Sequence, residues 1–319
     1  MKPPYQITNK TIELIASISE KIGEVNSAYL YKPPTELRRR NRIKTIQSSL
    51  EIEGNSLTLE QVTAILENRR VIAPKNDILE VKNAIKAYEE LEKYNPASIT
   101  AFCRAHAVLM DGLVDNPGKI RTTSVGIARG LALTHVAPPG NIVRSLVKAL
   151  FDYLKNGKDL LLIKSCVFHY EIEFIHPFID GNGRMGRLWQ TVILSQYSPV
   201  FEFLPIESII RSRQSEYYKI LGESDNLGES TGFIEFMLEI IDESLKELLI
   251  TQNVNIKNTD RISIFKELIR QSYFSRQSYM RQFKNISPAT ASRDLKMAVE
   301  NGFLEKQGDK RTTLYKFKK

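Results

Sequence analysis

The stretch that decides this fold is His176-Pro177-Phe178-Ile179-Asp180-Gly181-Asn182-Gly183-Arg184-Met185-Gly186-Arg187, which combines a base, a carboxylate, glycines and two arginines. Before it, residues 160–174 are apolar on nearly every side, which predicts a helix through the middle of a large core. Pro177 ends that helix, because the residue before a proline is pushed out of the α region. We therefore predict that His176 lies in an extended corner, with its imidazole facing a pocket.

The glycines and the segment after them predict an anion site. Gly181 and Gly183 permit a tight turn whose backbone N–H groups point at an anion, and Asn182 adds a side-chain amide. The apolar run 188–194 predicts a further helix, and a helix N-terminus carries partial positive charge where a phosphate would lie.

Each residue type in the stretch suits phosphoryl or nucleotidyl transfer. Asp180 supplies the hard oxygen ligand that Mg²⁺ takes beside phosphates. Arg184 and Arg187 lie three residues apart, so they share a helix face and can neutralise outer phosphates. His176 is left as the base, with an ordinary pKa of roughly 6.5. The spacing does not match a P-loop, and a plain Asp-Gly-Asn-Gly turn would not need all these groups together.

Residues 176–187 resemble the signature of the Fic family, His-Pro-Phe-x-Asp/Glu-Gly-Asn-Gly-Arg-x-x-Arg, at every specified position. The resemblance implies a mainly helical core that transfers AMP from Mg·ATP to a hydroxyl of a protein and releases pyrophosphate. It implies that His176 deprotonates the hydroxyl and that Asp180 holds Mg²⁺. It also implies that ATP and its phosphates are bound by Gly181, Asn182, Gly183, Arg184, Met185, Gly186 and Arg187.

A second motif precedes the core, in a predicted helix over residues 36–55. Glu53 continues the apolar stripe of this helix, with Ser49 one turn before it. A carboxylate directed inward needs a cationic partner. Residues 49–54 resemble the inhibitory motif of Fic proteins, Ser/Thr-x-x-x-Glu-Gly/Asn. The resemblance implies that Glu53 pairs with Arg187 and blocks a productive γ-phosphate.

Alternating apolar residues around Gly130 predict a β-hairpin in residues 125–136. The preceding residues 118–121, Gly-Lys-Ile-Arg, resemble the Gly-x-x-Arg lead of the Fic family. In the family this hairpin is a flap that docks the target protein by strand addition, a recognised mode of peptide binding. His135 near its end is predicted to be a surface residue.

Residues 204–221 predict one helix after the motif. Within it, Arg213, Tyr217 and Tyr218 resemble the Arg-x-x-x-Tyr-Tyr element that lines the adenosine side of the family's pocket. An aromatic face can hold a purine by stacking, but tyrosines at this spacing are usually core residues. Both interpretations stay open for Tyr217 and Tyr218.

Two other histidines are not predicted to bind a metal. His169, Glu173 and His176 share a face, but a zinc hydrolase of the usual type needs both histidines on one helix. Pro177 moves His176 off the helix, so His169 is interpreted as an interior histidine. His106, in a predicted helix over 98–110, is interpreted as a packed or surface histidine rather than a ligand.

Composition is ordinary for a globular protein, with 42% hydrophobic and 26% charged residues among 319. Two cysteines, Cys103 and Cys166, form neither a disulfide framework nor a metal spacing, which suits a reducing cytoplasm. Residues 1–19 make a poor signal peptide, and no apolar run approaches a membrane span. We therefore expect a cytoplasmic protein without a membrane partner.

The basic excess lies in the tail. Residues 261–319 hold 14 Lys and Arg against 5 Asp and Glu, a net charge of +9, whereas the whole chain carries +8, so residues 1–260 carry −1. Three predicted helices and a hairpin resemble a winged helix domain, with 288–300 as its recognition helix. Phosphates would meet Arg293, Lys296, Lys306, Lys310 and Arg311. Duplex DNA and a protein partner stay open as alternatives.

The predicted fold class is mainly α: a Fic-type helical core with a short β-hairpin flap, plus a C-terminal winged helix-turn-helix domain. We expect an N-terminal helical region at 1–95, a catalytic core at 96–250, a polar linker at 251–260 and the winged helix at 261–319. The resemblance to the Fic family implies that the chain is a protein adenylyltransferase, a nucleotidyltransferase that uses Mg·ATP, acts on Ser, Thr or Tyr and is autoinhibited by Glu53.

Two alternatives remain. A DNA-binding regulator whose core senses nucleotide would not need the base His176, and the same site could instead remove AMP, with Glu53 positioning water. The sequence leaves open the target protein and whether the chain forms a homodimer.

Overall fold

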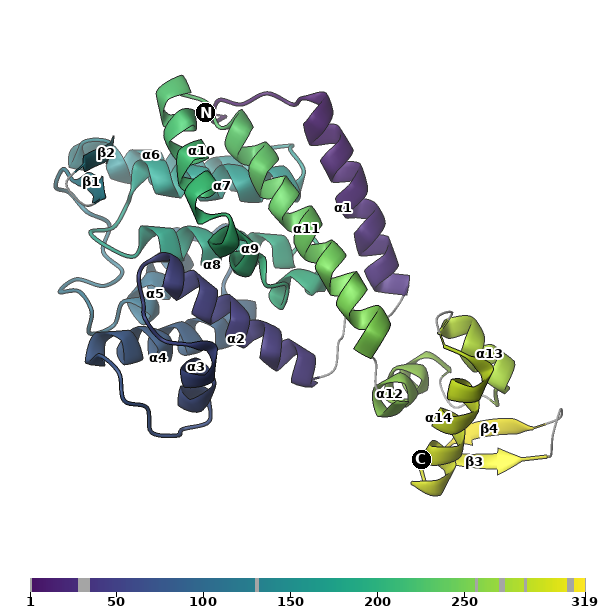
Figure 1. Ribbon diagram of the computed structural model, residues 1–319. Coiled ribbons are helices and arrows are strands. Elements are labelled where there is room, and N and C mark those ends of the chain that lie inside the picture. Colours follow the sequence, from purple (N-terminus) through teal and green to yellow (C-terminus); the bar gives the residue numbers. More distant parts are fainter. Residues whose placement is uncertain are drawn as a thin grey trace. The chain divides into compact units, whose positions relative to one another are not determined.

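The computed structural model describes residues 2–27, 35–129, 132–255, 258–269, 273–283, 286–308 and 313–318 (Figure 1). The chain forms two compact units, one of Met1–Ile22 with Thr35–Leu245 and one of Gly23–Pro34 with Lys246–Lys319. Each unit is considered by itself. The first is almost wholly helical and holds the histidine motif.

The larger unit is built from helices and one hairpin. Its elements are α1 (Asn9–Ser27), α2 (Thr35–Ile52), α3 (Leu59–Leu66), α4 (Lys75–Glu89), the 3₁₀ turn η1 (Leu91–Lys93), α5 (Ile99–Leu109), β1 (Gly126–Arg129), β2 (Ala132–Val136), α6 (Gly140–Asn156), α7 (Leu161–Ile175), α8 (Asn182–Ser195), η2 (Pro199–Glu202), α9 (Ile206–Ser212), α10 (Gln214–Leu227) and α11 (Thr231–Asn255).

Helix α7 runs through the core, as its sequence predicts, and packs along α8. Aromatic side chains from α5, α7 and α8 meet edge to face, with ring centroids 5.1 Å apart for Phe102 and Trp189 and 5.9 Å for Phe102 and Phe168. Such edge-to-face contacts add to the stabilisation that burial provides. The helices that carry the motif therefore rest on a rigid aromatic base.

Helix α1 is not among the elements predicted above, although its sequence has the periodicity of a helix. Ile18, Ile22 and Val25 follow the i, i+4, i+7 spacing of a helix face, and all three are buried. Two early prolines, Pro3 and Pro4, precede this periodic segment.

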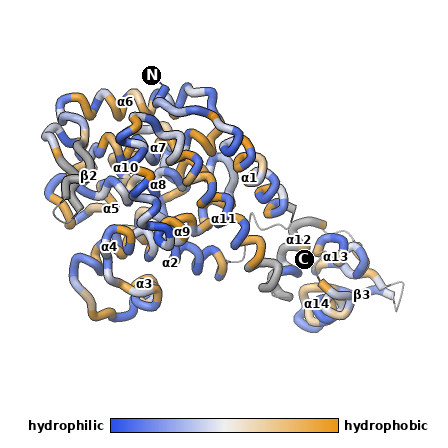
Figure 2. Tube along the Cα trace, turned by 45° about the horizontal axis from the view of Figure 1, so that its top comes forward, coloured by the Kyte–Doolittle hydropathy of each residue, from blue (hydrophilic) through white to orange (hydrophobic). Residues whose placement is uncertain are grey.

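Hydrophilic residues dominate helix α2 (Figure 2), yet many side chains from Asn41 onward are buried. It packs against α9, and its buried side chains include Ser48 and Ser49 as well as Ile46 and Leu50. After Gly54, which adopts φ +94, Thr58 and Gln61 form a capping box at the start of α3, as their three-residue spacing predicts. The C-terminal end of α2 is therefore fixed by its packing against α9 and by the turn that leads into α3.

Several predicted boundaries differ from the structure. The amphipathic pattern of residues 78–94 predicts one helix, whereas the structure has a helix that begins at Lys75 and a 3₁₀ turn after Glu89. The single helix predicted over 204–221 is broken at Arg213, whose φ and ψ of −109 and 28 separate α9 from α10. The linker predicted over 251–260 is helical in its described part, because no glycine or proline ends α11 before Asn255.

The predicted hairpin is confirmed: β1 and β2 pair antiparallel, with a register shift between Ile127 and Ala128. Gly130 and Leu131, at its tip, lie outside the described residues. Gly140 begins α6 in close contact with the backbone of Thr122, where any Cβ would overlap. The hairpin is therefore anchored to the chain just before it.

The second unit contains three helices and a hairpin, the arrangement predicted for the tail. These are α12 (Asn258–Ile269), α13 (Arg276–Gln282), α14 (Pro288–Glu300), β3 (Leu304–Gln307) and β4 (Leu314–Phe317), the strands being antiparallel. Phe265, Tyr279 and Leu295 belong to its own buried core. Lys310 and Arg311, predicted to meet phosphates, lie outside the described residues.

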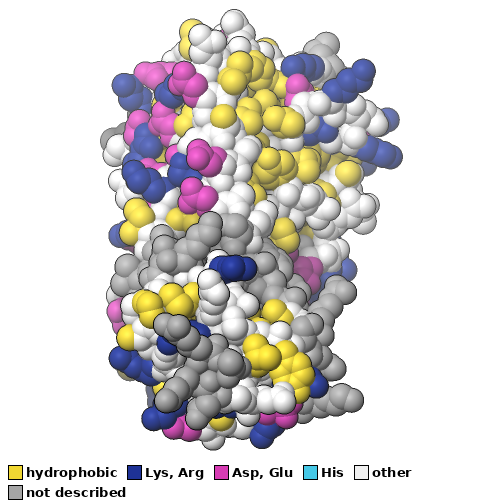
Figure 3. Space-filling model, turned by 90° about the vertical axis from the view of Figure 1, so that its right-hand side faces the viewer, with side chains coloured by type: hydrophobic (Ala, Val, Ile, Leu, Met, Phe, Trp, Pro, Cys, Tyr) yellow, Lys and Arg dark blue, Asp and Glu magenta, His cyan; other side chains and the backbone are white. Residues whose placement is uncertain are grey.

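The surface carries apolar side chains as well as charged ones. Ile7 and Ile12 are about half exposed. The face drawn in Figure 3 shows several groups of hydrophobic side chains together with Lys, Arg, Asp and Glu side chains. Among the described helices, none combines the length and the apolar character that a membrane crossing requires.

Candidate active site

The loop between α7 and α8 presents His176 to a cavity. His176 adopts φ 49 and ψ 62, so the extended conformation predicted for it is wrong: the residue ends α7 in the left-handed region. Left-handed residues commonly end helices, and for a residue other than glycine this conformation costs free energy. Other parts of the fold must therefore hold His176 in place.

Arg121 is the side chain that holds it. This buried guanidinium donates to the carbonyl oxygens of His176 at 2.6 Å, Ile175 at 3.0 Å, Pro138 at 2.8 Å and Thr123 at 2.6 Å. Burial lowers the pKa of Arg121. Sequence reasoning identified Arg121 only as a lead into the hairpin, yet it links the hairpin's base to the histidine loop.

His106 holds the other side of the loop. Its Nδ1 accepts from Gly118 N at 2.7 Å, so its Nε2 carries the proton and donates to the carbonyl oxygen of Asp180 at 2.9 Å. The ring stacks on Phe178 at 3.6 Å, and burial lowers the pKa of His106 to about 4. Of the two places predicted for His106, packed or at the surface, the structure shows the packed one, with both ring nitrogens hydrogen-bonded.

Helix α8 begins earlier than predicted, at Asn182. Gly181 precedes it with φ +83, and a Cβ there would lie 2.7 Å from Met110 Sδ. The Asn182 amide, expected to face an anion, instead bonds both backbone atoms of Phe178 at 2.9 Å. What faces an anion here is the first turn of α8, where backbone N–H groups lack intrahelical acceptors.

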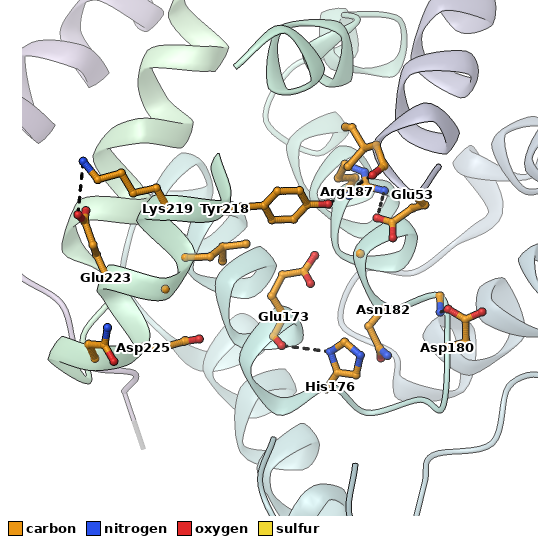
Figure 4. A pocket seen from close by; sticks show the side chains of 16 residues that line it. Glu53, Glu173, His176, Asp180, Asn182, Arg187, Tyr218, Lys219, Glu223 and Asp225 are labelled. Atoms are coloured by element: carbon orange, nitrogen blue, oxygen red, sulfur yellow. Dashed lines mark hydrogen bonds and ion pairs between the residues drawn. The ribbon is translucent and has the colours of Figure 1, made fainter. Parts of the chain in front are cut away.

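A cavity of about 740 Å³ opens at this helix start (Figure 4). The end of α2 lines it with Ile52 and Glu53, and α7 with its loop contributes Glu173 and His176. The N-terminal part of α8 supplies a third wall. One side of α10, from Tyr218 to Asn226, closes the cavity opposite. Segments far apart in the chain thus meet around one space large enough for a nucleotide.

Glu53 and Arg187 form an ion pair inside this cavity, as the motif resemblance implies. Arg187 Nη2 lies 2.7 Å from Glu53 Oε1 and 2.9 Å from the carbonyl oxygen of Ser49, and Nε donates to Ser49 Oγ at 3.0 Å. The Arg187 side chain is 1% exposed. Burial is the largest single effect and works to lower the pKa of Arg187, but the interactions with Glu53, Tyr217 and Glu173 together outweigh it and the pKa is raised.

Gly183 explains how closely Glu53 approaches α8. A Cβ at Gly183 would overlap Glu53 Oε1 and would lie 3.2 Å from Arg187 Nη1. The carboxylate of Glu53 therefore already lies beside the helix N-terminus, where an anionic ligand would be placed.

Glu173 is a cavity residue that sequence reasoning considered only for zinc. Its Oε1 accepts from the Tyr217 hydroxyl at 3.2 Å. Burial works to raise the pKa of Glu173, but the interaction with His169, whose Nε2 lies 3.8 Å from Oε1, and the charges of Arg187 and His176 together outweigh it and lower the pKa. Glu173 thus adds negative charge near Arg187.

The two tyrosines have different places. Tyr217 is fully buried, with its hydroxyl 3.0 Å from His169 Nε2, and is not part of the cavity wall. Tyr218 does line the cavity, and its hydroxyl lies 3.4 Å from the carbonyl oxygen of Ile52. The geometry therefore supports contact with a nucleotide for Tyr218 and a supporting position for Tyr217. His169 is an interior histidine, as predicted.

The remaining residues of the motif lie beneath the cavity. Met185 is fully buried, and a Cβ at Gly186 would lie 2.8 Å from the ring of His169. Arg184, expected to reach an outer phosphate, is buried and pairs with Glu80 at 2.7 Å and with Asp180 at 3.1 Å. Of the two motif arginines, only Arg187 lines the cavity.

Asp180 fits a magnesium ion that arrives with a nucleotide. Its side chain is 60% exposed and lines the cavity. No cluster of three or more His, Cys, Asp or Glu suited to a metal occurs within the described parts of the chain. Mg²⁺ is commonly held by one or two carboxylates together with substrate phosphates and water, so a single carboxylate is a suitable donor set here.

Comparisons with known proteins point to one family. A model of the Fic/DOC family matches residues 96–194. The chain is 30% identical over 251 residues to "Protein adenylyltransferase fic-1" of Caenorhabditis elegans, which is 74% of this chain and 47% of that protein. It is 27% identical to "Protein adenylyltransferase Fic" of Nematostella vectensis, over 77% of this chain and 58% of that protein. The chain thus spans about half the length of these curated relatives.

A solved structure matches the chain over its whole length. The crystal structure of a Fic family protein from Desulfovibrio desulfuricans is 39% identical, with a TM-score of 0.77. The match covers 100% of this chain and 98% of the other.

Proposed function

The chain belongs to the Fic family, and we propose that it is a protein adenylyltransferase, which transfers AMP from ATP to a hydroxyl group of a protein. The observation that carries this proposal is the meeting of His176, the start of α8 and Asp180 around one cavity. The curated relatives support this proposal, since both are named protein adenylyltransferases.

In the proposed reaction, a target hydroxyl attacks the α-phosphorus of ATP. A new oxygen–phosphorus bond forms, the bond to the β-phosphate breaks, and pyrophosphate leaves. His176 takes the proton of the hydroxyl, as a general base does. The N–H groups at the start of α8 stabilise negative charge on the phosphates. Asp180 would hold Mg²⁺, which supplies further charge neutralisation at phosphate oxygens.

We propose that Glu53 inhibits this reaction and that the β1–β2 hairpin docks the target. The ion pair of Glu53 with Arg187 leaves that guanidinium unavailable to a γ-phosphate. An edge strand of the hairpin offers main-chain groups to an extended peptide. The location we propose is a reducing cytoplasm, in keeping with the two free cysteines.

The test is a labelling experiment with purified full-length protein. ATP labelled on the α-phosphate should label the protein itself or a protein in a cell lysate, and ATP labelled on the γ-phosphate should not. Label from the γ-phosphate would indicate kinase activity instead. Release of AMP from protein that is already labelled would favour the alternative in which the same site removes AMP.

For the second unit we propose binding to duplex DNA. The acidic residue in the middle of α14, Asp294, is turned inward and neutralised by Arg261 at 2.7 Å, whereas Arg293 and Lys296 are exposed. The exposed middle of α14 is therefore cationic. A cationic helix that follows a short helical turn suits phosphate and groove contacts.

Full-length protein is expected to bind duplex DNA with an affinity that falls steeply between low and physiological salt. The charge reversals Arg293→Glu and Lys296→Glu should weaken this binding, measured by fluorescence anisotropy. Lys93→Glu, at an exposed lysine of the first unit, serves as the control. No retention of DNA at low salt, or an equal loss with the control, would favour a protein partner.

A further inference from the structure

Arg184 is a cation of the motif that the proposed mechanism leaves without a role. Its side chain is 6% exposed and lies outside the cavity wall. Nη1 donates to Glu80 Oε1 at 2.7 Å, Nη2 donates to Asp180 Oδ1 at 3.1 Å, and Nε is buried without a partner among the described residues. The guanidinium therefore lies between two carboxylates.

The two carboxylates are not equivalent. Glu80 comes from α4, is 21% exposed and makes the shorter contact, whereas Asp180 is 60% exposed and lines the cavity. One guanidinium neutralises one carboxylate, so the three groups together keep one negative charge. Glu80 is closer to Arg184 and less exposed than Asp180, so it interacts more strongly with the guanidinium. The negative charge that is not neutralised therefore lies on Asp180.

Glu80 is itself fixed by the segment that follows the inhibitory residue. The Asn55 amide donates to Glu80 Oε2 at 2.8 Å and to the carbonyl oxygen of Asp77 at 3.1 Å. Asn55 is buried and lies two residues after Glu53. The carboxylate of Glu80 therefore has a partner for each oxygen, and its position depends on the chain beyond α2.

We propose that Glu80 is a positioning residue of the active site: by neutralising Arg184, it leaves the charge of Asp180 available to a divalent cation that arrives with ATP. The proposal rests on the proposed function, because it concerns the same nucleotide site. Without the charge of Glu80, Arg184 would turn wholly to Asp180 and would compete with the cation for its oxygens.

The substitution Glu80→Gln keeps the shape of the side chain and removes its charge. In a Glu53→Gly background, the concentration of Mg²⁺ that gives half-maximal tightening of ATP binding should rise about tenfold, since charged groups in contact couple strongly. The affinity for ATP without Mg²⁺ should stay unchanged. Isothermal titration of ATP over a Mg²⁺ series measures both, independently of AMP transfer.

Two further variants sharpen the test. Asp77→Asn, on the same helix, removes the charge of a carboxylate that accepts from Ser56 N and Oγ and has no contact with Arg184, so its Mg²⁺ requirement should equal that of the parent. Arg184→Gln removes the cation itself, so its Mg²⁺ requirement should fall. The two substitutions at Glu80 and Arg184 are thus expected to act in opposite directions, which keeps the proposal testable even if one variant does not fold.

The outcomes are distinct. An equal loss of ATP binding with and without Mg²⁺ in Glu80→Gln, or an unchanged Mg²⁺ requirement in both charge variants, would make Glu80 structural only. A raised requirement in Asp77→Asn would attribute the effect to a loosened segment and overturn the proposal. If the parent binds Mg·ATP but transfers no AMP, the proposed function fails while the Mg²⁺ dependence still decides the role of Glu80.

Discussion

Replacing His176 by alanine is expected to lower AMP transfer by roughly 10²–10⁴-fold, the usual contribution of a general base, while ATP binding survives. The imidazole would act on the incoming hydroxyl, whereas the start of α8 and Arg187 would bind the nucleotide. Transfer is measured with ATP labelled on the α-phosphate, and binding by isothermal titration. A parallel loss of binding would make His176 a structural residue.

The left-handed conformation of His176 provides a matched control. Glycine adopts φ 49 without the strain that alanine meets there, so His176→Gly should keep the loop in place and remove only the imidazole. Both variants should be equally inactive, although the alanine variant should be less stable by about 1 kcal/mol. Recovery of transfer in His176→Gly would show that backbone strain, and not the missing base, caused the loss in alanine.

Replacing Glu53 by glycine is expected to raise automodification by about 10²-fold, because misplacement of reacting groups costs this much in rate. Removing the carboxylate frees Arg187 for a γ-phosphate and clears the space beside Gly183. Glu51→Gly is the matched control, since Glu51 pairs with Arg211 and is not part of the cavity wall. Labelling of both variants over time measures the difference.

Two additional results follow from the same ion pair. Glu53→Gly combined with Arg187→Ala should lose the gain, because activation depends on the released guanidinium. Glu53→Gly alone should be less stable by about 1–3 kcal/mol, since buried Arg187 loses its charged partner, although Glu53 is 30% exposed. Labelling of Glu53→Gly at the wild-type rate would return Glu53 to the role of a helix-end residue.

Local patterns predicted much of the fold. Residues 160–174 are apolar all round, and α7 is buried at nearly that span. The cap formed by Thr58 and Gln61 and the hairpin after Arg121 also follow from local sequence. No local pattern predicts the break at Arg213, because neither glycine nor proline lies beside it. Only the packing of α9 and α10 ends one helix there and begins the next.

The site was predictable only where its residues belong to a recognisable motif, as residues 176–187 and 49–54 do. Glu80 and Arg121 reach the motif from distant segments, and no spacing in the sequence links them to Arg184 or His176. Tyr217 and Tyr218 show a related limit. Adjacent helical residues point about 100° apart, so one faces the core and the other the cavity, and the sequence does not say which.

Arg121 sets where a target strand would lie if it docks on the hairpin as proposed. Its four carbonyl bonds join the hairpin's base to the backbone of His176, so a strand docked on the hairpin would lie at a set distance from the imidazole. Side chains along a strand alternate between its two faces. If the docked strand shifted its register by one residue, the accepting hydroxyl would point away from His176. If it shifted by two residues, the hydroxyl would lie beyond His176. Which residue is modified would then depend on its position along the docked strand and only weakly on the chemical nature of the neighbouring side chains.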